Sequence, residues 1–182
     1  DLFLRSLQAR LVTPFAGLRA KQLGRIVARV DAHAAGLKAL DDDALRARAR
    51  DVRFTLRRHA EPRRDDVALC FAIIREAAGR VLGHRHFAVQ LIGGYALLRG
   101  MVAEMGTGEG KTLTVTLAAI TAAFSGLPVH VVTVNDYLAK RDLEILGPLY
   151  AFFGLSVGSV VQGLTPDQRR AAYACDVAYC TN

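Results

Sequence analysis

The sequence predicts an α/β fold, a doubly wound parallel sheet with helices on both faces, preceded by a purely helical segment. From residue 101 onward, short runs rich in β-branched residues alternate with helical patterns, an order typical of parallel strands joined by right-handed crossovers. A glycine-rich turn, Thr107–Thr112, lies between the first run and the first helix, where sheets of this kind bind their ligands. Residues 1–80 carry helical patterns and no strand pattern.

Four helices are expected in the N-terminal part, over residues 2–12, 14–33, 45–59 and 67–82. Leu2–Val12 is short and amphipathic, so it would lie on a lipid surface or dock on the body of the protein. Thr13–Pro14 fits the N-cap and first position of the next helix. Asp41–Asp43 and Asp65–Asp66 place acidic caps at the positive ends of the two helices that follow.

In the C-terminal part we expect strands over residues 101–105, 129–134, 155–161 and 177–180, and helices over residues 111–124, from 135 onward, and over 166–173. Val129–Val134 is rich in β-branched residues and is predicted to be a buried strand. Asn135–Asp136 begins the middle helix. Thr165–Gln168 matches a capping box, with Thr as N-cap, Pro at the first helical position and Gln at the third.

The composition is that of a globular protein. Its 182 residues are 52% hydrophobic and 23% charged, and a chain of this size buries roughly 70% of its unfolded surface. No apolar run reaches the roughly 18 residues of a spanning helix, and Arg5 and Arg10 interrupt any signal-peptide pattern. Cys70, Cys175 and Cys180 form no CxxC pair, which favours free thiols in the cytoplasm.

The basic excess lies wholly in the N-terminal third. Residues 1–64 hold 15 Lys and Arg against 7 Asp and Glu, whereas residues 65–182 hold 9 against 10. Such a segment would meet an acidic membrane surface, an acidic partner or nucleic acid, or would be a set of solvated helix faces. Few aromatic residues interleave with the arginines, which argues against binding of single-stranded nucleic acid.

The turn Thr107–Thr112 is predicted to bind phosphate. Gly108 and Gly110 allow a tight turn that comes close to a ligand, and the N–H groups after them cradle phosphate oxygens at the start of a helix. Lys111 would contact the β- and γ-phosphates, and the Thr112 hydroxyl would ligate Mg²⁺. The strict pattern G-x-x-x-x-G-K-[ST] fails because position 105 is Met, but the helicase-type pattern x-x-T-G-x-G-K-T is met in full.

A glutamine precedes this turn at a fixed distance. Gln90 lies 21 residues before Lys111. Its amide offers both a donor and an acceptor, as the N6 and N7 edge of adenine requires. Gln90 is therefore a candidate for adenine recognition, although any surface glutamine has the same chemistry.

Four segments carry longer motifs: R-H-F-A-V-Q-L-I-G-G at Arg85–Gly94, A-E-M-G-T-G-E-G-K-T-L at Ala103–Leu113, V-H-V-V-T-V-N-D-Y-L-A-K-R-D at Val129–Asp142, and Y-C-T-N at Tyr179–Asn182. Together they resemble the SecA family of bacterial preprotein-translocase ATPases. The resemblance covers about residues 37–182 and is densest over residues 85–142. The family also has Met at the position of Met105.

The resemblance implies a P-loop NTPase domain, RecA-like and similar to DEAD-type helicases. Residues 1–80 would be a basic helical N-terminal segment, and residues 81–182 the first part of nucleotide-binding domain 1, so that the domain is incomplete. The implied nucleotide ligands are Gln90 for adenine, Thr107, Gly108, Glu109 and Gly110 for the phosphates, Lys111 and Thr112 as catalytic residues with Thr112 on Mg²⁺, and Arg141 near the nucleotide.

The resemblance also implies an activity and partners. Such a motor binds ATP and Mg²⁺ and couples hydrolysis to the movement of unfolded preproteins through the SecYEG channel. It would be cytoplasmic and peripheral on the inner face of the cell membrane, with its basic N-terminal segment against acidic phospholipid, and no nucleic-acid partner is expected.

Three residues depart from the family pattern. Gly106 stands where Arg is usual, His84 where Met is usual, and Cys180 where Gly is usual. The sequence also contains no Asp-Glu-x-Asp segment for Mg²⁺ and water activation, so we expect no turnover from this stretch alone.

Two alternatives stay open. A DEAD-type nucleic-acid helicase shares the phosphate loop and the glutamine, although it usually carries P-T-R-E-L-A where this chain has Thr133–Ala139. A degenerate, non-enzymatic SecA-like remnant would use only its basic helices.

Overall fold

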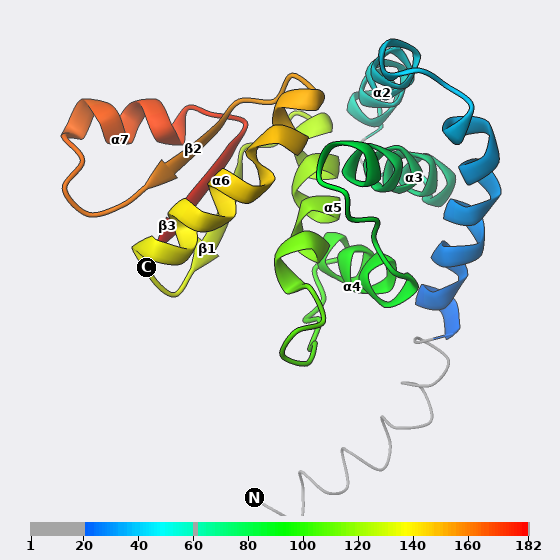
Figure 1. The fold of residues 1–182 in the computed structure, drawn as a ribbon, viewed down its shortest axis with the longest axis horizontal. Helices are drawn as coiled ribbons and strands as arrows, with labels where there is room; N and C mark the ends of the chain where they lie inside the picture. The colour runs from blue at the N-terminus through cyan, green and yellow to red at the C-terminus, as the bar shows by residue number, and fades with distance from the viewer. Residues whose placement is uncertain (1–20, 60–61, 182) are drawn as a thin grey trace, which may run out of the picture.

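The computed structural model describes residues 21–59 and 62–181 (Figure 1). The elements are a helix over residues 21–38, α2 (Asp42–Arg57), α3 (Arg64–Val81), α4 (Ala88–Leu98), α5 (Lys111–Phe124), β1 (Val129–Thr133), α6 (Asp136–Phe152), β2 (Val157–Val160), α7 (Pro166–Tyr173) and β3 (Val177–Thr181). The helix expected over residues 2–12 and the helix start at Thr13–Pro14 lie outside the described residues.

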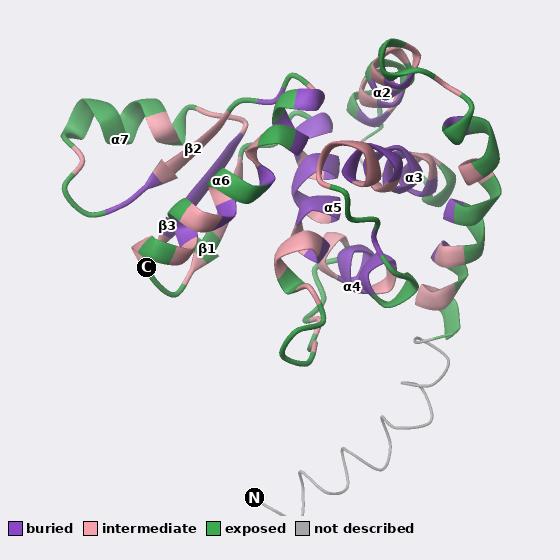
Figure 2. Ribbon diagram, in the orientation of Figure 1, coloured by how far each residue is buried: buried purple, intermediate pink, exposed green. Residues whose placement is uncertain are grey.

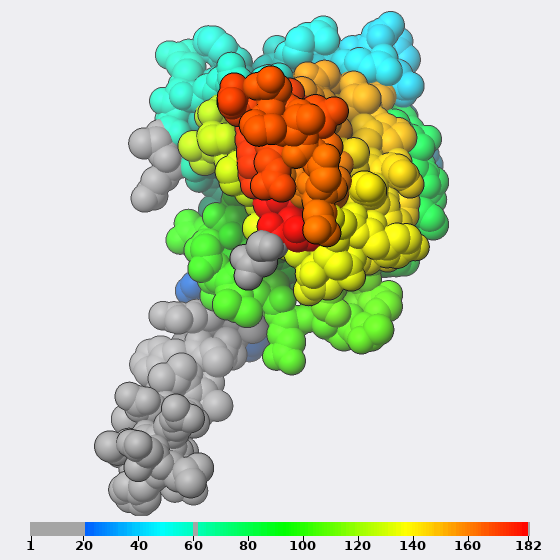
Figure 3. All heavy atoms as spheres, turned by 90° about the vertical axis from the view of Figure 1, so that its left-hand side faces the viewer, coloured from blue at the N-terminus to red at the C-terminus, as the bar shows by residue number. Residues whose placement is uncertain are grey.

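The strands form a parallel sheet with helices on both faces, as the sequence predicts. The strand order is β1-β3-β2. Alternate residues of a strand point to opposite faces, and each face has its own helix. On one face the Tyr173 ring of α7 lies edge-on to His130, with centroids 5.3 Å apart. On the other face the Tyr150 hydroxyl of α6 lies 2.9 Å from the Tyr179 hydroxyl. Figure 3 shows α6 and α7 as neighbouring parts of one side of the molecule.

Two predictions about strands are wrong. Residues 101–106 form no strand, and Val102 is 96% exposed. A strand needs a neighbour for its N–H and C=O groups, and the sheet of the described residues has none beside this segment. The second wrong prediction is that β1 is buried: its residues alternate between half-buried and exposed. β1 is an edge strand of that sheet, and its Val132 is 61% exposed.

Most helix starts agree with their sequence signals. The Asp41 side chain accepts a hydrogen bond from Ala44 N at 2.8 Å, and the Thr165 capping box is formed as predicted. α3 begins one residue before Asp65–Asp66, so these carboxylates lie in the first turn rather than at the cap. The N-terminal helix ends at residue 38, beyond the expected 33. α4 was not assigned from the sequence.

The core lies among α3, α5 and α6, where the buried residues gather (Figure 2). α4 packs closely on α5 because Gly94 has no side chain. A Cβ at this position would lie 2.8 Å from Leu117 Cβ and 3.3 Å from the backbone oxygen of Thr114, closer than packed carbon atoms allow. This close approach holds the N-terminal end of α4 beside the loop that precedes α5.

Gly94→Ala should therefore destabilise the fold. Overpacking at a site of this kind costs about 1–3 kcal/mol, which urea denaturation measures. Gly147→Ala in α6 is the matched control, since a Cβ there meets nothing within 4 Å, and replacing a helical glycine by alanine stabilises by about 0.5–1 kcal/mol. A Gly94→Ala protein as stable as the wild type would contradict the packing described.

Candidate nucleotide-binding site

The loop between residues 106 and 111 has the backbone of an anion site. Gly108 and Gly110 have φ angles of 85° and 79°, values that residues with a side chain rarely adopt. α5 begins directly after Gly110, and its first helical bond runs from Thr114 N to Gly110 O at 3.0 Å. The N–H groups of the first turn therefore have no partner within the helix, and they attract negative charge together with the helix dipole.

Lys111 closes the loop on itself. Its Nζ donates a hydrogen bond to the carbonyl oxygen of Gly106 at 3.0 Å. The N–H of Gly106 in turn donates to Glu109 Oε2 at 2.6 Å. The segment from residue 106 to 111 is thus a compact turn, and it projects from the end of α5 (Figure 1).

Gln90 ties α4 to this turn. Its Oε1 accepts a hydrogen bond from Phe87 N at 2.9 Å, and its Nε2 donates to the carbonyl oxygen of Glu109 at 2.8 Å. The side chain is buried, with 4% of its surface exposed. A Cβ at residue 110 would lie only 2.3 Å from Gln90 Nε2, so Gly110 is required by both its backbone angle and this contact.

A pocket of about 920 Å³ opens beside the turn. Of the residues predicted to bind nucleotide, it is lined by Gln90, Gly108, Glu109, Gly110, Thr112 and Arg141. Lys111 and Thr107 are not part of its lining; the Lys111 ammonium group is turned to the Gly106 carbonyl. The structure thus brings residues from three separate motifs to one pocket.

Arg141 is held at the pocket wall by its neighbour in sequence. Its Nε and one terminal nitrogen donate to the same oxygen of Asp142, at 3.1 and 2.6 Å. Asp142 is buried, with 7% of its surface exposed. The pairing fixes the direction of the guanidinium group on α6, because the buried Asp142 carboxylate is itself held in place and forms strong charge-assisted hydrogen bonds.

The other lining residues are not among the predicted nucleotide ligands: Leu82, Gly83, His84, Arg85, Phe87, Val89, Leu113, Ile145 and Leu146. Among them Arg85 is positioned by α3. One of its terminal nitrogens lies 3.0 Å from an oxygen of Glu76, a buried carboxylate that also pairs with Arg80 at 3.0 Å. Arg85 passes over Gly79, where a Cβ would lie 2.6 Å from its Cγ. The R-H-F motif at Arg85–Phe87 is the sequence feature that points to this side of the pocket, which Arg85 and Phe87 line.

His86 fastens the same wall to α5. Its Nε2 lies 3.0 Å from the carbonyl oxygen of Leu113 and 3.1 Å from Thr116 Oγ1. Burial lowers the pKa of His86 to about 4. The hydrogen bond to Leu113 acts in the opposite direction and raises the pKa, whereas the positive charge of Arg75 lowers it further. The imidazole is therefore neutral at pH 7 and donates its Nε2 proton to α5.

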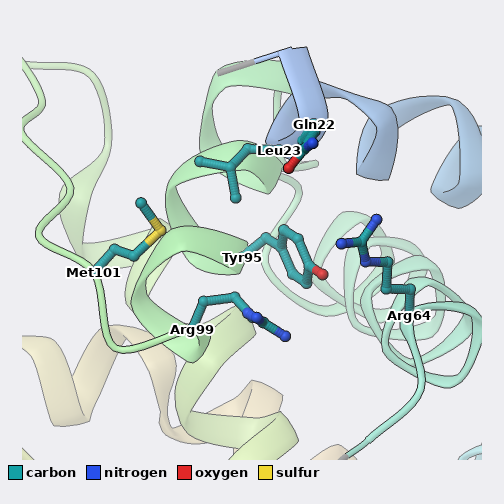
Figure 4. A pocket seen from close by; sticks show the side chains of 6 residues that line it. All are labelled: Gln22, Leu23, Arg64, Tyr95, Arg99 and Met101. Atoms are coloured by element: carbon teal, nitrogen blue, oxygen red, sulfur yellow. The ribbon is translucent and has the colours of Figure 1, made fainter. Parts of the chain in front are cut away.

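A smaller hollow of about 290 Å³ lies where the N-terminal helix meets α4. Figure 4 shows the side chains of Arg64 and Arg99 on either side of Tyr95, with Leu23 and Met101 along another wall. None of the residues predicted for nucleotide binding lines it. The pocket at the turn is therefore the candidate site.

A glycine turn at the N-terminus of α5, a helix that packs on a parallel sheet covered on both faces, defines the class of P-loop α/β domains. A family model described as the SecA DEAD-like domain matches residues 11–182. The chain belongs to this SecA family.

Curated relatives agree with the family match. The chain is 53% identical to protein translocase subunit SecA 2 of Bordetella avium, over 87% of this chain and 24% of the relative. It is 49% identical to SecA 2 of Nitrosospira multiformis, over 100% of this chain and 27% of the relative. It is also 50% identical to SecA of Bdellovibrio bacteriovorus, over 89% of this chain and 18% of the relative. The chain thus spans about a quarter or less of these relatives. None of the helices formed by the described residues is long and apolar enough to cross a membrane.

Acidification should weaken the fold through His86. The unfolded chain takes up a proton near pH 6.5 but the folded protein only near pH 4, so stability falls as the pH drops between these values. The difference corresponds to about 3 kcal/mol at most. Urea denaturation of wild type and His86→Gln from pH 7 to pH 4 measures it, with the exposed His130→Gln as control. Equal pH dependence of wild type and His86→Gln would contradict this account.

Proposed function

We propose that this chain is the ATP-binding part of a SecA-type motor, which couples ATP hydrolysis to the movement of preproteins through the SecYEG channel. The observation that carries the proposal is the turn at the start of α5. Its two left-handed glycines line a pocket at the start of the helix, and Gln90 and Arg141 also line this pocket. The SecA membership of the chain supports the same function.

The phosphate end of the nucleotide would lie on the turn. The N–H groups from Thr107 to Gly110 would donate to phosphate oxygens, and Lys111 would leave the Gly106 carbonyl to contact the β- and γ-phosphates. Thr112, which lines the pocket, would ligate the Mg²⁺ that arrives with the nucleotide. When bound, the metal neutralises charge that develops on the phosphates.

The base would lie toward α4. Gln90 already uses one lone pair of Oε1 and one hydrogen of Nε2. An amide has a second lone pair and a second hydrogen, so it can receive adenine while keeping its hold on the loop. Arg85 and Phe87 line the same side of the pocket. Arg141, oriented by Asp142, would approach the nucleotide from α6.

The proposed partners follow from the family and from charge. They are the SecYEG channel, an unfolded preprotein and acidic phospholipid, with a cytoplasmic location on the inner face of the cell membrane. The relatives are named protein translocase subunits. The basic excess of residues 1–64 suits an acidic lipid surface, whose attraction amounts to about 1 kcal/mol per basic residue near it.

Lys111→Ala in the full-length protein should abolish ATP hydrolysis and weaken Mg-ADP binding by about 100-fold, because the ammonium group is the charge nearest the phosphates. Calorimetry with Mg-ADP and a phosphate-release assay with SecYEG vesicles measure both effects. Lys38→Ala, at an exposed lysine that does not line the pocket, is the control and should match the wild type. Undiminished binding in Lys111→Ala would refute the assignment, and stimulation by RNA without stimulation by SecYEG would favour a helicase.

A further inference from the structure

The side chain of Glu109 occupies the anion-binding loop of its own chain. Its Oε2 accepts the hydrogen bond from Gly106 N at 2.6 Å, while its main-chain N–H lies 3.4 Å from the Gly106 oxygen. A carboxylate that accepts from a backbone N–H forms one of the stronger hydrogen bonds in proteins. Glu109 therefore closes the first half of the turn with a negative charge.

The main chain of Glu109 is fixed, but its side chain is free to leave. Gln90, which is buried, holds the Glu109 carbonyl oxygen at 2.8 Å. The Glu109 side chain itself is exposed, so it can turn into water without disturbing the core. A side chain with two such positions, one of them on the loop, can act as a latch.

Gly106 leaves the room for this latch. Its φ is not among the positive values, so the backbone does not require glycine there. A Cβ would instead lie 3.1 Å from Glu109 Cδ and 3.3 and 3.4 Å from the two carboxylate oxygens. A larger residue would require the carboxylate to shift by a few tenths of an ångström, which loosens its hydrogen bond to the Gly106 N–H. The same glycine carbonyl also accepts the hydrogen bond from Lys111, so both charged side chains of the loop converge on one residue.

We propose that the Glu109 carboxylate is a latch that competes with nucleotide phosphate for the loop and must swing into solvent before phosphate is bound. Two negative groups at one site repel each other, and release of the latch also frees the Gly106 N–H as a donor. The inference rests on the proposed nucleotide binding. In this proposal the side chain of Glu109 opposes the binding of nucleotide phosphate, whereas the main-chain N–H of the same residue supports that binding. Glu109 is thus a positioning residue.

The test is calorimetry with Mg-ADP on the full-length protein. Glu109→Gln keeps the shape and the acceptor but removes the charge, and should lower Kd about tenfold, the difference between a charged and a neutral hydrogen bond. Glu109→Ala should also lower it. Glu104→Gln, an exposed carboxylate on the same segment, is the matched control and should stay within about twofold of wild type.

Gly106→Ala probes the other side of the contact. Its Cβ should weaken the contact of the carboxylate with the Gly106 N–H and lower Kd. The combination with Glu109→Ala should bind no more tightly than Glu109→Ala alone, because Glu109→Ala already removes that contact. In the nucleotide-free protein, exchange of the Gly106 amide hydrogen should be faster in Glu109→Ala than in wild type, a readout independent of activity.

Unchanged or raised Kd values in both Glu109 variants, with wild-type binding that Lys111→Ala abolishes, would overturn the latch and leave the proposed function intact. Absence of Mg-ADP binding in wild type and in all variants would overturn both. Additive effects of Gly106→Ala and Glu109→Ala would show that the two residues act separately, which also contradicts the latch.

Discussion

The hydrogen bond from Gln90 to the carbonyl oxygen of Glu109 is the interaction on which the candidate site depends. It joins α4 to the turn before α5 at 2.8 Å, and it forces residue 110 to be glycine. A buried amide that lost this partner would be left with an unsatisfied donor, at a cost of about 1–3 kcal/mol. The position of the loop relative to the pocket is therefore set by α4 as much as by the helix that follows the loop.

This bond in turn requires accurate packing of three helices. α4 reaches the loop because Gly94 lets it approach α5. The wall before α4 is held by two polar contacts, from Arg85 to the buried Glu76 of α3 and from His86 to α5. Glu76 and His86 are buried, with 5% and 1% of their surface exposed, and a buried polar group without a partner is expensive. The pocket wall before α4 is thus held by contacts to α3 and α5.

The sequence predicted the fold class, the alternation of helices and strands from residue 111 onward and most helix caps, because periodicity and caps are local properties. It also located the turn, since glycine spacing reflects backbone angles that Gly108 and Gly110 do adopt. It failed on residues 101–105 because strand formation depends on a neighbour that local pattern does not reveal. The Glu76–Arg85 pair and the contact of Gln90 with Glu109 join residues distant in sequence, and nothing in their spacing predicts them.

The two ends of the loop are held unequally. On one side Gly110 is bound between α5 and Gln90, whereas on the other side residues 101–106 leave α4 without entering the sheet. Gly106 lies at the junction, and its N–H and C=O groups are satisfied only by Glu109 and Lys111 among the described residues. Two of these partners are exposed charged side chains of the loop itself, so the conformation of its first half depends on charge. In the proposed function, a bound phosphate would therefore reorganise this first half, while the half anchored by Gln90 would keep its geometry.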